Sequence, residues 1–293
     1  MDRTSTNAWA ESGVAYEGYA ADPGLNATAL KQGIVSPLHM HAVLTGEGKE
    51  TTPAMRWGTL AHLVVLEPER FHKETVMWTG RELKSGKNKG ETTFAHSGAE
   101  WEEFEAEAER TGRTPVDEPE CDELLALSNS VHANRHAHRL IAGSEHELSL
   151  FWTDRRYGPA KARVDGYGKR SIGLVEYKTT AQVAPEAFGR TFFNLHYGLQ
   201  LAWYRHALQT IYRRKTMPVH VIVSEAKPPH DCVVYRVSDE VLDAGYERAV
   251  EVAMRYRICE HLCEYPGVSS EIEELSLPAW AKPDVELDFT GTE

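Results

Sequence analysis

Residues 146–180, "HELSLFWTDRRYGPAKARVDGYGKRSIGLVEYKTT", decide the expected fold. Three stretches, 146–154, 160–167 and 172–179, alternate apolar and polar residues and are rich in aromatic and β-branched side chains. The turn-like pieces "RRYG" and "GKRS" separate them. This pattern is typical of strands joined by short turns, so we expect a three-strand meander here.

Helical patterns flank this meander on both sides. We expect helices over 56–68, 99–110, 121–142, 185–212 and 238–264, and two more strands over 219–226 and 231–237. Helices, a meander, a helix, two strands and a helix predict an α/β domain with a central mixed sheet flanked by helices. The expected boundaries are a flexible N-terminal arm over 1–25, a single domain over 26–265 and an acidic C-terminal tail over 266–293. Within the domain, 26–145 is the helical part and 146–265 the catalytic core.

Composition narrows the class of protein. No apolar run in the 293 residues approaches the ~20 residues that span a bilayer, and the N-terminus shows no secretion signal. Four cysteines in so long a chain do not form the pattern of a disulfide framework. We therefore expect a soluble cytoplasmic protein with no membrane partner.

The net charge of −12 is unevenly distributed. Residues 99–123 hold eleven acidic and two basic residues, and residues 269–293 hold seven and one. The rest of the chain is slightly basic, with Lys and Arg gathered at 81–89, 155–170 and 205–215. A local basic groove for nucleic acid is compatible with this balance, and so are solvated loops and helix faces.

The last strand of the meander carries the candidate chemistry. Side chains alternate along a strand, so Glu176 and Lys178 share a face. A hairpin through "GYGKRS" would bring Asp165 beside Glu176, and two adjacent carboxylates favour a cation between them. Mg²⁺ or Mn²⁺ suits such oxygen ligands, and a neighbouring lysine can hold a water or offset charge on a phosphate. A salt bridge on a solvated sheet edge is the alternative interpretation of the same residues.

The surroundings of this motif resemble the PD-(D/E)XK nuclease superfamily, and within it the RecE-type (exonuclease VIII-like) phage and prophage exonucleases. The similar pieces come in family order: "LKQGIVSPLHMHAVL", "RWGTLAHLVVLEPERF", the strand region, "HYGLQLAWY" and "LPAWA". The resemblance implies a restriction-endonuclease-like core with an N-terminal helical extension. One departure is Val164, which stands where the motif has proline.

The resemblance also implies roles for individual residues. Asp165 and Glu176 would be metal ligands, Lys178 the catalytic lysine and His62 a further ligand. Gln200 and Tyr204, one helical turn apart, would help to position the lysine and the DNA backbone. Their alternative is ordinary helix packing.

Other residues are weaker candidates. Glu147 could contact a second metal or a water, or be an exposed edge residue. Thr179 and Thr180 could touch a phosphate or satisfy the strand end, and Lys84, Lys87 and Lys89 are candidate phosphate contacts.

Three further patterns do not point to a site. Cys259 and Cys263 lack the cysteine triplet of an iron–sulfur nuclease. His132, His136 and His138 have zinc-like spacing but no accompanying HExxH. "GRELKSGKN" has the wrong glycine spacing for a phosphate loop, so we expect no ATP site.

The motif of Asp165, Glu176 and Lys178, together with the resemblance, predicts a Mg²⁺-dependent exonuclease that degrades linear double-stranded DNA from its ends without ATP. The resemblance implies 5′→3′ resection in a bacterial host cell, for recombination with a RecT-type annealing protein, and a ring-like homo-oligomer. An endonuclease, a structure-specific nuclease or a non-catalytic DNA-end-binding module would fit the same motif.

Overall fold

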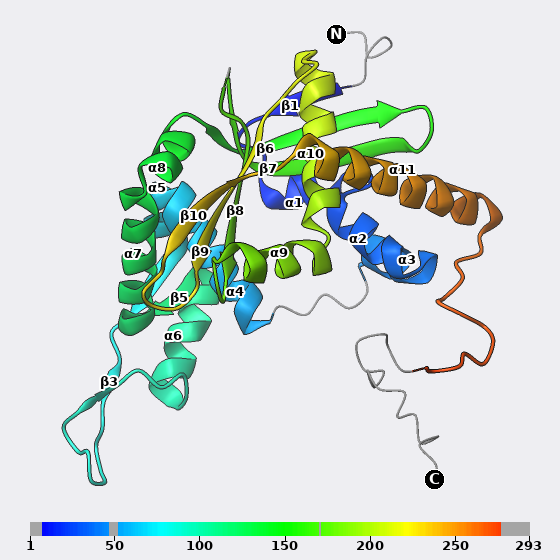
Figure 1. The fold of residues 1–293 in the computed structure, drawn as a ribbon. Coiled ribbons are helices and arrows are strands. Elements are labelled where there is room, and N and C mark those ends of the chain that lie inside the picture. The colour runs from blue at the N-terminus through cyan, green and yellow to red at the C-terminus, as the bar shows by residue number, and fades with distance from the viewer. Residues whose placement is uncertain (1–7, 47–51, 170, 277–293) are drawn as a thin grey trace, which may run out of the picture.

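The computed structural model describes residues 8–46, 52–169 and 171–276, which form a mixed six-stranded sheet between two layers of helices (Figure 1). The strand order is β1-β6-β7-β8-β9-β10. The strands are β1 (Ala8–Glu11), β6 (Glu145–Asp154), β7 (Gly158–Gly168), β8 (Gly173–Thr180), β9 (Val219–Glu225) and β10 (Cys232–Arg236). Neighbours are antiparallel except β8 and β9, which are parallel. The expected meander, the two later strands and the mixed α/β fold are confirmed.

Alternation along the strands builds two separate cores. Leu174 of β8 faces a core formed with α2 (Ala27–Val35), α3 (Pro37–Thr45), α9 (Pro185–Asn194), α10 (Tyr197–Tyr212) and α11 (Asp239–Leu262). Val175 and Tyr177, pointing the other way, join the core under α4 (Pro53–Leu66), α5 (Pro68–Glu74), α7 (Glu118–Ala133) and α8 (Arg135–Ala142). The central strands are therefore buried on both faces over much of their length.

Two expected long helices are each divided by a local backbone feature. Asn134 interrupts the helix expected over 121–142, because its side-chain oxygen caps α8 by accepting from the backbone N–H groups of His136 and Ala137. His196 adopts a left-handed conformation (φ 53°) and separates α9 from α10. The second break sets the direction of α10 across the sheet.

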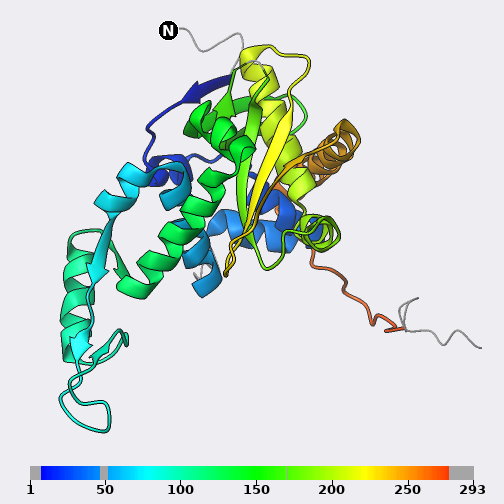
Figure 2. The same ribbon diagram turned by 60° about the vertical axis from the view of Figure 1, so that its left-hand side comes forward.

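Residues 75–117 form an outlying unit beside the main sheet (Figure 2). Strands β2 (Thr75–Trp78) and β5 (Thr114–Asp117) pair in parallel, and α6 (Ala99–Arg110) packs on β5. Between them, β3 (Arg81–Glu82) and β4 (Thr92–Thr93) form a hairpin that projects from the body. The helix expected over 99–110 is present.

The expected loosely held arm over residues 1–25 is wrong for residues 8–25. Strand β1 pairs with β6, and α1 (Tyr16–Ala21) follows it. The buried ammonium of Lys161 anchors this segment by donating to the carbonyl oxygens of Tyr19, Ala20 and Asp22. A short, weakly apolar strand gains its stability from pairing with β6, a contact that local sequence does not reveal. Residues 1–7 lie outside the described residues.

The C-terminal segment and the cysteines complete the description. Residues 266–276 follow α11 without a helix or strand, and residues 277–293, with the "LPAWA" piece, lie outside the described residues. All four cysteines are free. Within the described ranges, no helix has the length and apolar character needed to cross a membrane.

Candidate metal-dependent active site

The site lies where β7 and β8 separate. Their ladder ends at Gly166 and Val175, and one step further the register would place Asp165 opposite Glu176. Instead of continuing the ladder, Asp165 accepts the backbone N–H of Tyr177 through its carboxylate, at 2.8 Å. This bond satisfies the freed strand donor and holds the aspartate between the two strands.

Three candidate ligands meet at this point. The ligand atoms of His62, Glu147 and Asp165 all lie within 4.8 Å of one another. His62 reaches the site from α4, with its Nδ1 3.6 Å from an Asp165 oxygen and its ring against Tyr177. Glu147 has a left-handed backbone (φ 50°), and one of its oxygens accepts from Arg163 at 2.6 Å. Elements remote in sequence therefore build one group of a nitrogen and two carboxylates.

Glu176 lies beside this group but is not a member of it. The residue is buried, and its Oε1 accepts from Lys178 at 2.5 Å and from Gln200 at 2.7 Å. Its Oε2 is buried with no hydrogen-bond partner among the described residues. A buried carboxylate oxygen is normally paired, so this atom has the environment expected of a metal ligand.

Helix α10, which covers the face of the sheet that Glu176 shares with Leu174, fixes the orientation of the glutamate. Gln200 donates from Nε2 to Glu176, and the same nitrogen lies 3.2 Å from the hydroxyl of Tyr204. Burial raises the pKa of the Tyr204 phenol well above its ordinary value. Gln200 thus contacts Glu176 directly, whereas Tyr204 contacts it through Gln200.

The sequence interpretation missed Lys31 and Tyr197. Lys31 of α2 donates to Oε1 of Gln200, which fixes which end of the amide faces Glu176. The ammonium groups of Lys31 and Lys178 both lie over the ring of Tyr197, at 4.9 and 5.4 Å from its centroid. Lys31 is part of the quoted "LKQGIVSP" piece, but only the packing of α2 against α10 brings it to this site.

Burial strongly perturbs the titration of these groups. It raises the pKa of Asp165 to about 6, and burial together with the charge of Asp165 raises the pKa of Glu176 to about 7. Burial and the charge of Lys178 lower the pKa of His62 to about 4. The adjacent carboxylates raise the pKa of Lys178 despite its burial, so this lysine stays protonated at neutral pH.

The remaining predicted residues fall in two places. Thr179 and Thr180 follow Lys178 on β8 and line a large cavity next to the site. Lys84, Lys87 and Lys89 belong to the β3–β4 hairpin, which projects away from the sheet (Figure 1). Lys84 pairs with Glu100 at 2.7 Å. The three hairpin lysines are therefore not part of the group of candidate ligands, and their contact with DNA stays a prediction.

The residues present fit a divalent cation. His62, Glu147 and Asp165 provide three ligands, and the unpaired Oε2 of Glu176 offers a fourth from the neighbouring strand. The carboxylate oxygens suit Mg²⁺ or Mn²⁺, whereas an imidazole nitrogen is more often a ligand of softer transition metals.

A family model described as "PDDEXK-like domain of unknown function (DUF3799)" matches residues 26–278. This chain belongs to that family. The PDDEXK-like fold is also that of a crystal structure described as a "Putative exonuclease" from Eubacterium rectale. The two structures share a TM-score of 0.60 and 10% sequence identity over 92% of this chain and 97% of the other. No curated protein matches the sequence significantly.

Proposed function

We propose that this PDDEXK-like protein is a metal-dependent nuclease that hydrolyses phosphodiester bonds in DNA. The observation that carries the proposal is the meeting of His62, Glu147 and Asp165 within 4.8 Å, next to the buried Glu176–Lys178 pair. A salt bridge on a solvated edge, the alternative interpretation of the motif, does not account for a buried, unpaired carboxylate oxygen on Glu176.

The chemistry divides between the cation and the chain. When bound, a divalent cation supplies Lewis-acid polarisation of the phosphate and lowers the pKa of an attacking water. Hydrolysis forms a bond from a water oxygen to phosphorus and breaks the bond to the leaving ester oxygen, which takes up a proton. Lys178 is protonated, so it acts as a hydrogen-bond donor that holds the water or a phosphate oxygen and offsets developing negative charge.

The surrounding residues keep this arrangement rigid. Gln200 and Lys178 both donate to one oxygen of Glu176, and the other oxygen, which has no hydrogen-bond partner among the described residues, would be the one to hold a cation. Lys31 fixes Gln200 in turn. Such outer contacts orient metal ligands and commonly matter for activity by about 10–100-fold.

The proposal extends to an ATP-independent exonuclease that acts on the ends of linear double-stranded DNA, 5′→3′. Support comes from the RecE-type sequence resemblance and from the likeness to the structure described as a "Putative exonuclease". The same resemblance supports a recombination role in phage or prophage with a RecT-type partner, Mg²⁺ as the ion, and a ring-like homo-oligomer.

Linear duplex labelled at the 5′ or the 3′ end, compared with closed circular duplex, tests the proposal. We expect Mg²⁺-dependent loss of the linear DNA alone, with early release of the 5′ label, and no loss in EDTA. Cutting of the circle would instead show an endonuclease. Binding of ends without cutting in Mg²⁺ or Mn²⁺ would show a non-catalytic module.

A further inference from the structure

A cavity of about 980 Å³ lies next to the candidate site. The start of α4, the end of β8, the β9–β10 turn and the outlying unit of residues 75–117 all line it. Its size is at the upper end of the range, about 300–1,000 Å³, of pockets that hold small organic molecules. The cavity is therefore large enough for an unstacked nucleotide.

Two elements connect the cavity to the metal ligands. Thr180 lines the cavity two residues beyond Lys178 on the same face of β8, about 7 Å along the strand. Trp57 lines it five residues before His62 on α4, about 7.5 Å along the helix. A DNA strand with one phosphate at the site would thus place a neighbouring nucleotide at the cavity.

The cavity offers aromatic surface and a donor. Trp57 and Trp101 both line it, and Trp101 is held by His96, whose ring stacks on it at 4.0 Å. The indole Nε1 of Trp57 is buried with no hydrogen-bond partner among the described residues. The ammonium of Lys227 lies 5.3 Å from the centroid of the Trp57 ring. Flat aromatic faces with a nearby cation are the usual means of holding unstacked bases.

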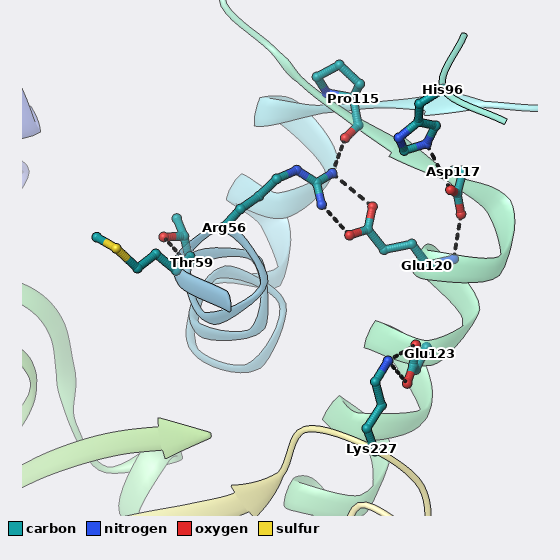
Figure 3. A network of polar contacts seen from close by, with 9 residues as sticks. Arg56, Thr59, His96, Pro115, Asp117, Glu120, Glu123 and Lys227 are labelled. Atoms are coloured by element: carbon teal, nitrogen blue, oxygen red, sulfur yellow. Dashed lines mark hydrogen bonds and ion pairs between the residues drawn. The ribbon is translucent and has the colours of Figure 1, made fainter. Parts of the chain in front are cut away.

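The charges in the wall favour a base over a phosphate in the interior. Figure 3 shows Arg56 paired with Glu120 and Lys227 paired with Glu123, so both cations are tied to α7. Glu105 also lines the cavity, and a carboxylate there repels a phosphate but can accept a hydrogen bond from an exocyclic amine.

We infer that this cavity binds one or two unstacked bases of the substrate strand, next to the phosphate that is cut. The inference rests on the proposed nuclease function and adds a base-binding subsite to it. Trp57 provides the stacking surface, and Thr180 lies between the cavity and the catalytic Lys178. The ion pairs Arg56–Glu120 and Lys227–Glu123 connect α4 and the β9–β10 turn to α7.

The test uses full-length Lys178→Ala protein, which should bind substrate without consuming it. Affinity is measured in Mg²⁺ for oligonucleotide duplexes with one abasic nucleotide at successive positions from each end. Trp57→Ala, added to this background, should weaken binding of intact DNA by about 5- to 150-fold, the equivalent of about 1–3 kcal/mol for one stacked base. Trp9→Ala, at a half-exposed tryptophan on the opposite sheet edge, is the matched control.

The decisive readout is the dependence on position. When the abasic nucleotide stands at one or two particular adjacent positions, the proteins with and without the Trp57→Ala substitution should bind equally. When it stands at any other position, the difference in affinity between the two proteins should remain. Trp57→Phe should restore most of the affinity, which separates stacking from a folding defect. If Trp57→Ala changes DNA affinity equally at every abasic position, or not at all, while wild type still cleaves DNA, the base-binding cavity alone would be overturned. If wild type neither cleaves nor binds DNA, the proposed function itself would be overturned.

Discussion

The amide nitrogen of Gln200 donates to Oε1 of Glu176 at 2.7 Å, and this bond connects α10 to β8, the strand that carries Lys178. Both residues are buried, and Lys178 donates to the same oxygen. The orientation of Glu176 is therefore determined by Gln200 of α10 as well as by Lys178 within β8. This hydrogen bond and the residues near it lead to testable predictions.

Gln200→Leu should lower kcat for linear DNA by about 10–100-fold with little change in KM, because the carboxylate of Glu176 loses the contact that positions it. Mn²⁺ affinity, followed by titration, should fall as well. The control is Gln209→Leu on the same helix, whose side-chain amide donates to the carbonyl oxygen of Lys215, away from Glu176. Equal effects of the two substitutions would argue that Gln200 is merely structural.

Gly58→Ala should make the protein more stable and less active. An added Cβ at Gly58 would meet nothing within 4 Å, and replacing a helix-interior glycine by alanine raises the free energy of unfolding by about 0.5–1 kcal/mol. Gly58 lies one turn before His62 on α4, so the methyl group enters the space we assign to substrate. Gly189→Ala on α9, which also meets nothing, should stabilise without lowering activity. Unchanged activity in Gly58→Ala would place the substrate elsewhere.

The stability of the metal-free protein should fall between about pH 6.5 and 7.5. The pKa values of Asp165 and Glu176 are raised to about 6 and 7, so their contribution is full below their unfolded pKa values and is lost as pH rises through the raised ones. The pKa of His62 is lowered to about 4, so its contribution is full above about 6.5 and is lost as pH falls through 4. Above pH 6.5 the contribution of His62 is constant. Burial lowers the pKa of Lys31 to about 8, so this lysine opposes the carboxylates as pH approaches 8.

Thermal melts with EDTA and with Mg²⁺ measure this dependence. The increase in Tm caused by Mg²⁺ should grow from pH 6 to pH 8, because the cation binds the deprotonated carboxylates. Asp165→Asn should flatten both dependences. A Mg²⁺ effect that is the same at pH 6 and pH 8 would contradict a cation site made of these residues.

Replacing Lys84, Lys87 and Lys89 together by alanine should weaken DNA binding without changing the single-turnover rate of cleavage. These lysines lie on a projecting hairpin, away from the catalytic group. If all three contact phosphates, the slope of log affinity against log salt should become shallower by about 2.7. An unchanged slope would exclude the hairpin from the DNA path.

Sequence reasoning predicted the strands of the core because apolar and polar residues alternate within them and short turns separate them. It also reached Asp165, Glu176 and Lys178, whose juxtaposition depends only on a hairpin and strand alternation. Lys31 and β1 escaped it, since their positions depend on packing between segments more than a hundred residues apart. Glu176 lies outside the three-ligand group because its carboxylate is hydrogen-bonded to Lys178 and Gln200. No sequence pattern predicts these two bonds.

The central claim is that cation-dependent hydrolysis of DNA occurs at Lys178 and its neighbouring carboxylates. The most direct test is the rate of nucleotide release from linear duplex DNA by wild type and Lys178→Ala, each in Mg²⁺ and in EDTA. We predict release only by wild type in Mg²⁺, with the variant folded and still able to bind DNA. Equal release by Lys178→Ala, or release by wild type in EDTA, would contradict the assignment of this site.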